Sequence, residues 1–111
     1  MRKSYIVSAK RTAIGSFLGG LATVKPKDMG SAVVKALLED ANEVICGNVL
    51  GAGLGQNIGR TIALEAGIPE TVCAHSVNMV CGSGLRTVME AVMSIQCGFN
   101  DIVVAGGVES M

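Results

Sequence analysis

The stretch Ser76-Val77-Asn78-Met79-Val80-Cys81-Gly82-Ser83-Gly84-Leu85 decides how this chain is organised. An apolar run leads into a cysteine, two glycines flank a serine, and a long amphipathic segment follows at once. This order predicts a strand that ends, a sharp turn, and a helix that starts at Cys81. The first amides of a helix have no partners inside it and carry a partial positive charge. Cys81 is therefore expected where negative charge is favoured.

Two interpretations of Cys81 follow from its setting. A thiolate at a helix start is stabilised and is a good nucleophile at neutral pH, and Gly82 and Gly84 let a substrate approach the backbone closely. Cysteine is also a common small buried hydrophobe, and spacing alone does not decide between the two. The other three cysteines lack this setting and are expected to fill the core: Cys46, Cys73 and Cys97.

The hydrophobic pattern predicts an α/β fold in the order βαβαβαβ, with a mostly parallel sheet covered by helices. We expect strands at 4–9, 43–46, 72–77 and 102–105, the third of them buried on both faces. We expect helices from Pro26 to about Ala41 or Asn42, from about Asn57 to Ala66, and from Cys81 to Gly98. On the first helix the expected apolar face is Met29, Ala32, Val33, Ala36 and Leu37, and on the third it is Leu85, Val88, Met89, Val92 and Ile95.

Composition excludes several classes of protein. The chain has 111 residues, of which 50% are hydrophobic and 16% charged, and its formal net charge is zero. A neutral chain without a basic block has no electrostatic footprint for nucleic acid, and no apolar stretch is long enough to span a bilayer. Four cysteines without a C-x-x-C pair favour free thiols in a reducing compartment, so we expect a cytoplasmic protein without disulfides or a metal site.

Three other motifs resemble functional sites but each lacks a feature that such a site needs. The segment Gly51-Ala52-Gly53-Leu54-Gly55-Gln56 resembles a dinucleotide loop, but Gln56 stands where that pattern needs glycine. Ser83 lacks the G-x-S-x-G spacing of a nucleophile elbow. His75, the single histidine, lies too far along an extended chain to reach Cys81, and we expect its ring to be satisfied by backbone groups.

Four blocks in order resemble the thiolase family, and together they cover essentially the whole chain. The segment 77–85 is similar to the thiolase nucleophile signature, and 5–17 to the opening strand and loop. Gly47-Asn48-Val49-Leu50 with Gly55-Gln56-Asn57 and Arg60 is similar to the loop before the second helix. The segment 103–111 is similar to the strand and glycine turn after the nucleophile helix. Within the family the likeness is greatest to the acetyl-CoA acetyltransferases.

The resemblance implies the first half of a thiolase, so residues 1–111 are expected to be a truncated N-terminal domain. It implies that Cys81 takes an acyl group from acyl-CoA as a thioester, in the reversible Claisen condensation of two acetyl-CoA to acetoacetyl-CoA and CoA. The Cys81 amide would be one donor of an oxyanion hole. The resemblance further implies no metal, no redox cofactor, and a homodimer or homotetramer with its contact near residues 74–77. Which residues hold the CoA substrates is left open.

Two departures from the family pattern bear on activity. The connector Asp40-Ala41-Asn42-Glu43 between the first helix and second strand is shorter than in the family. The family's activating histidine and second cysteine belong to a half that these residues do not include, and His75 does not replace that histidine. The alternatives are therefore a thiolase-type acyltransferase, a truncated and catalytically incomplete chain that acts only as an association partner or has no activity, and a Cys–His hydrolase using Cys81 and His75.

Overall fold

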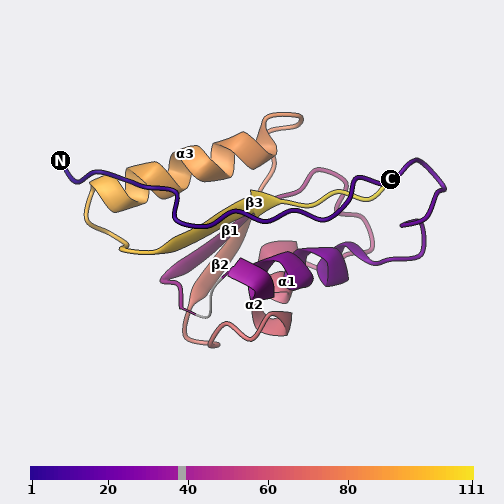
Figure 1. The fold of residues 1–111 in the computed structure, drawn as a ribbon, viewed down its shortest axis with the longest axis horizontal. Helices are drawn as coiled ribbons and strands as arrows, with labels where there is room; N and C mark the ends of the chain where they lie inside the picture. Colours follow the sequence, from indigo (N-terminus) through magenta and orange to yellow (C-terminus); the bar gives the residue numbers. More distant parts are fainter. Residues whose placement is uncertain (38–39) are drawn as a thin grey trace.

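A computed structural model describes residues 1–37 and 40–111 as a parallel sheet between helices (Figure 1). The strand order is β2-β1-β3, and both neighbours of the central strand run parallel to it. Helix α3 packs over β3 and β1 on one face, whereas α2 covers β2 and β1 on the other and carries α1 behind it. The elements are α1 (Pro26–Leu37), β1 (Glu43–Gly47), α2 (Ile58–Glu65), β2 (Cys73–Val77), α3 (Ser83–Gln96) and β3 (Val103–Gly107). The predicted α/β class is confirmed.

The main core lies between β1 and the helices α1 and α2. Its buried members come from every element except α3 and β2, and aliphatic side chains dominate it because the chain has few aromatic residues. They are Val34, Ala41, Val44, Cys46, Ile58, Ile62, Ala63, Ile68 and Val104. Helix α2 begins as predicted, with the Asn57 side chain accepting from the Arg60 N–H, and ends at Glu65 with Ala66 as its C-cap before Gly67.

The expected strand at 4–9 is absent from the described sheet. Tyr5, Ile6 and Val7 are between 75% and 84% exposed, and among the described residues this segment makes no backbone hydrogen bond to β3 or any other strand. Short apolar, β-prone residues make a strand only where a neighbouring strand supplies the hydrogen-bond ladder. The sequence pattern predicts an extended conformation for this segment, but it does not specify which strand the segment would pair with.

The first helix is shorter than predicted and buries a different face. The described helix ends at Leu37, and residues 40–42 are not helical; residues 38–39 of the expected helix lie outside the described residues. Val34 is buried, whereas Ala32 and Ala36 are exposed. Asn42 instead joins the sheet end, where its side-chain oxygen accepts from the Asp101 and Ile102 N–H groups at 2.9 and 2.8 Å.

Helix α3 buries small side chains, and the predicted stripe is only partly correct: Leu85 and Met89 are exposed, whereas its other members are half-buried, namely Val88, Val92 and Ile95. Ser83, Thr87 and Ala91 face the sheet, at 4%, 0% and 7% exposure. Leu85, Met89 and Met93 form an exposed row at i, i+4 and i+8 on the same helix. Periodicity identified an amphipathic helix correctly, but it assigned the buried face by hydrophobicity where close packing against glycine selected small residues.

Strand β2 is an edge strand and is only half buried. Cys73 and Ser76 are exposed and the other three residues are intermediate, so the expected burial on both faces is wrong. The physical reason is that α3 lies over β3 and β1 and leaves most of β2 uncovered.

Within the described ranges, no helix is both long and apolar enough to cross a bilayer.

Burial of Cys46 in β1 makes the unfolding free energy fall at alkaline pH. Desolvation raises the pKa of the Cys46 thiol from an ordinary 9.0 to about 11, so the folded chain keeps a proton that the unfolded chain releases. The stabilisation is therefore complete below about pH 9 and is lost as the pH rises toward 11.

We predict that Cys46→Val weakens this dependence. Between pH 8 and 10.5, the parent chain should lose about 2 kcal/mol more unfolding free energy than the variant. Urea unfolding at both pH values, under a non-thiol reductant, measures the difference. Equal losses would show that the Cys46 thiol is not buried as described.

Candidate nucleophile site

The three strands end at one edge of the sheet because they are parallel, and backbone hydrogen bonds join their ends. The Asn48 N–H donates to the Val77 carbonyl at 3.0 Å, which joins the end of β1 to the end of β2. The Val108 N–H donates to the Gly47 carbonyl at 3.0 Å, which joins β1 to β3. Ligands of open α/β sheets bind beyond the carboxyl ends of the strands, so this edge is where a site is expected.

Glu109 and Asn48 reinforce that edge, although neither is a predicted site residue. Asn48 is buried, and its Nδ2 donates to the Val108 carbonyl at 3.0 Å and to Glu109 Oε1 at 2.7 Å. The same carboxylate accepts from the Val49 N–H at 3.1 Å and the Leu50 N–H at 3.2 Å. Their position in the sequence could have indicated this role, since Asn48 directly follows β1 and Glu109 lies two residues after β3, at the same edge of the sheet.

The first turn of α3 rests directly on glycines at these strand ends. A Cβ atom at Gly47 would lie 2.8 Å from the Ser83 carbonyl carbon and 2.9 Å from the Gly84 nitrogen, so no side chain fits there. The Thr87 hydroxyl lies 2.6 Å from the Gly84 carbonyl oxygen and 3.3 Å from the Gly106 carbonyl oxygen, within donating distance of both. The start of α3 is thereby fixed to the sheet edge by backbone contact.

Cys81 lies on the turn between this edge and α3. The helix begins at Ser83 with Gly82 as its N-cap, so Cys81 precedes the helix by two residues instead of opening it. Its side chain is exposed, which excludes the core-filler interpretation in this structure. A backbone bridge pairs Cys81 with Met79, so the exposed thiol lies on a tight turn directly before the helix.

The other cysteines differ from what was expected of them. Cys46 is buried as predicted, but Cys73 and Cys97 are exposed, so the core-filler prediction is wrong for both. Cys73 opens the uncovered edge strand and Cys97 follows the last turn of α3. All four thiols are free.

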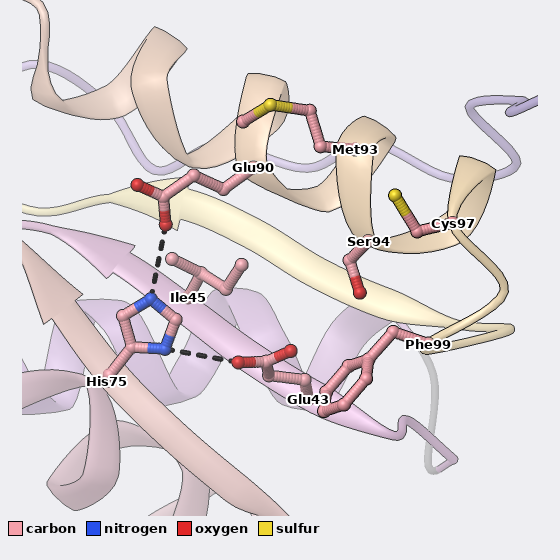
Figure 2. A pocket seen from close by; sticks show the side chains of 8 residues that line it. All are labelled: Glu43, Ile45, His75, Glu90, Met93, Ser94, Cys97 and Phe99. Atoms are coloured by element: carbon pink, nitrogen blue, oxygen red, sulfur yellow. Dashed lines mark hydrogen bonds and ion pairs between the residues drawn. The ribbon is translucent and has the colours of Figure 1, made fainter.

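His75 takes part in a separate cluster on the α3 face of the sheet. Figure 2 shows its ring between two carboxylates, with Nδ1 3.2 Å from Glu43 Oε1 and Nε2 3.2 Å from Glu90 Oε2. The prediction of backbone partners is therefore wrong, because carboxylates of β1 and α3 are within reach. Within the described chain, no hydrogen bond joins His75 to Cys81, so nothing supports a Cys–His pair.

This cluster borders an open hollow of about 280 Å³ whose other lining is largely apolar. Burial disfavours the charged form of Glu90, but hydrogen bonds from Arg86 and His75 outweigh it and hold the pKa of Glu90 below its ordinary value. Arg86 Nε lies 3.0 Å from Glu90 Oε1, an i, i+4 ion pair on α3. The hollow is lined by Glu43, Ile45, His75, Glu90, Met93, Ser94, Cys97 and Phe99 (Figure 2), and Cys81 is not among them.

The remaining motifs do not form a second site. The glycine segment 51–56 is a mostly exposed turn between β1 and α2, and Gly53 and Gly55 adopt positive φ there. Ser83 is buried and turned toward the backbone of the Cys81 turn, so it presents no hydroxyl to solvent. No group of three or more His, Cys, Asp or Glu side chains arranged to hold a metal ion occurs in the described part of the chain.

Comparison with known proteins identifies the family of this chain. Residues 4–111 match the thiolase N-terminal domain. The acetyl-CoA acetyltransferase of Escherichia coli is 52% identical over 118 aligned positions, which cover all of this chain and 30% of that protein. The cytosolic acetyl-CoA acetyltransferase of Mus musculus is also 52% identical, covering 96% of this chain and 28% of that protein.

A solved structure agrees in fold. The crystal structure of the Acat5 thiolase of Ascaris suum in complex with coenzyme A superposes with a TM-score of 0.92 at 39% identity. The match covers 96% of this chain and 30% of that one. The chain thus spans about 30% of the length of these relatives.

We predict that Gly47→Ala lowers the unfolding free energy by about 1–3 kcal/mol or more, because the new methyl group meets the backbone of the first α3 turn. Urea unfolding measures the loss. The matched control is Gly106→Ala on β3, where a Cβ meets nothing within 4 Å. The contact is disproved if the two variants are equally stable.

Proposed function

This chain belongs to the thiolase family, because residues 4–111 match the thiolase N-terminal domain. We propose that it carries the nucleophile of a thiolase-type acyltransferase. The single observation that carries the proposal is the Cys81 turn, where an exposed thiol lies two residues before the first residue of α3. We assign the substrates as acetyl-CoA and acetoacetyl-CoA because the relatives are acetyl-CoA acetyltransferases. The solved relative contains coenzyme A, which supports the same class of substrate.

The proposed chemistry begins with the Cys81 thiolate. It attacks the carbonyl carbon of the acetyl-CoA thioester, and the Cys81 N–H donates to the oxygen that becomes negatively charged. Collapse of this adduct breaks the bond to CoA, whose sulfur leaves and takes a proton. A second acetyl-CoA, deprotonated at its methyl carbon, then attacks the Cys81 thioester to give acetoacetyl-CoA and regenerate the thiol.

The proposed reaction needs no metal or redox cofactor, because every step is an acyl or proton transfer. It does need a base and an acid beside Cys81, and His75 is engaged by Glu43 and Glu90 elsewhere on the sheet. We therefore propose that the base and the acid are supplied by a part of the thiolase that corresponds to the portion of the relatives this chain does not match. Four free thiols and a cytosolic relative support a cytoplasmic location.

The experiment that tests this function is a chimera in which this chain replaces the matching segment of the Escherichia coli relative. We predict thiolysis of acetoacetyl-CoA by the chimera and a loss of at least about a thousandfold in Cys81→Ser. Cys97→Ser, at a second exposed thiol, should leave the rate unchanged. A Cys81→Ser chimera as active as its parent would reject the assignment.

A second candidate function is association without catalysis, and the surface of α3 favours considering it. The exposed row Leu85, Met89 and Met93 lies on α3, and among the described residues β2 pairs only with β1, so its outer side is open. Exposed apolar patches and open strand edges mark surfaces that pair with other chains. We propose that two copies of this chain associate through β2 and this row, whether or not the assembly is active.

We predict a dimer in sedimentation-velocity measurements at micromolar concentration, and a monomer for Met89→Glu, because the charge would be buried at the contact. Leu64→Glu is the matched control, since Leu64 is similarly exposed on α2, across the sheet. The proposed contact is rejected if Met89→Glu remains as dimeric as the parent.

A further inference from the structure

Val80, directly before Cys81, holds a backbone conformation that its side chain opposes. Its φ is +50°, in the left-handed region where β-branched residues are rarely found. The Val80 side chain is 65% exposed, so packing does not compensate for the strain. Such a conformation persists only when surrounding contacts impose it, and it recurs at functional sites.

The hydroxyl of Ser83 supplies those contacts. It donates to the Val80 carbonyl at 2.6 Å and accepts from the Met79 N–H at 2.8 Å, so it bridges the Asn78–Met79 peptide to the Val80–Cys81 peptide across the strained residue. The Ser83 N–H also donates to the Val80 carbonyl, at 3.1 Å. Asn78 Oδ1 accepts from the Val80 N–H at 3.0 Å, but Asn78 is exposed, whereas Ser83 is 4% exposed.

The placement of Ser83 in the helix is unusual for a serine that stabilises a helix start. It occupies the first position of α3, one residue after the N-cap Gly82, which makes no side-chain cap. Its hydroxyl points back into the turn and not along the helix. The side chain is itself held in place, because the Ser83 backbone lies against Gly47 at the sheet edge.

We propose that Ser83 is a positioning residue that fixes the direction of the Cys81 thiol and amide by holding Val80 at positive φ. Without the hydroxyl, the Met79 N–H and the Val80 carbonyl each lose a buried partner. Val80 then relaxes to negative φ, and the peptide that joins it to Cys81 rotates. The catalytic meaning of this role rests on the proposed function, but the geometry is tested without any CoA substrate.

The test measures the alkylation rate of Cys81 by iodoacetamide in the folded chain, with peptide mapping. Cys73 and Cys97 are exposed elsewhere in the chain and serve as internal references in each sample. Ser83→Ala should lower the Cys81 rate about tenfold relative to both references, because small displacements of a reacting group have large effects. Ser83→Thr, which retains the hydroxyl, should stay within about threefold of the parent.

Rescue at Val80 separates positioning from general stability. Glycine adopts positive φ without strain, so Ser83→Ala combined with Val80→Gly should recover the Cys81 rate to within about threefold. If Ser83→Ala fails to fold, folding of the double variant supports the proposal and its failure to fold overturns it. An unchanged rate in Ser83→Ala, or a fall that Val80→Gly does not restore, also overturns it. Failure of acetyl transfer to Cys81 would contradict the proposed function, but it would not change the alkylation rates of Cys81 relative to Cys73 and Cys97.

Discussion

The contact on which the site depends is the approach of α3 to the ends of β1 and β3. Gly47 allows the Ser83–Gly84 backbone to lie where a side chain would otherwise be, and Thr87 lies within hydrogen-bonding distance of the Gly106 carbonyl oxygen. Because the helix start is fixed there, Ser83 is fixed too, and the turn that carries Cys81 has a rigid base. The hydrogen bonds of Asn48 and Glu109 hold the neighbouring strand ends in register beneath that turn.

The same contact explains the two faces of α3. Only small side chains fit between the helix and glycine-bearing strands, so Ser83, Thr87 and Ala91 are buried. Leu85, Met89 and Met93 are then left on the outer side of the helix, where they form the exposed apolar row. One constraint thus gives both a precise nucleophile turn and a surface suited to a partner chain.

Local signals in the sequence were sufficient for the order and type of most elements. Asn57 before and Gly67 after α2 fix its ends, and the glycines after Cys81 mark the turn, because each acts on neighbouring backbone. The strand expected at 4–9 and the buried face of α3 could not be predicted in this way. Both depend on which segment lies alongside, and hydrophobic periodicity does not encode the partner.

The residues of the candidate site differ in the same way: some could be predicted from local sequence and others could not. Cys81 was identified from its spacing and from family resemblance, both of which are local features of the chain. The clamp of Asn48 by Glu109 joins residues about 60 positions apart, and the carboxylates around His75 come from two other elements. The positive φ of Val80 had no signal at all, because valine is not a residue that favours it.

The most direct test of the account is to incubate the reduced chain with acetyl-CoA and map the acetyl thioester by mass spectrometry. Cys73, Cys81 and Cys97 are all exposed, so accessibility alone would modify the three of them comparably. The account predicts that the acetyl group accumulates on Cys81 in preference to the other two. An acetyl group spread evenly over the three thiols, or found on Cys73 and Cys97 but not on Cys81, would contradict it.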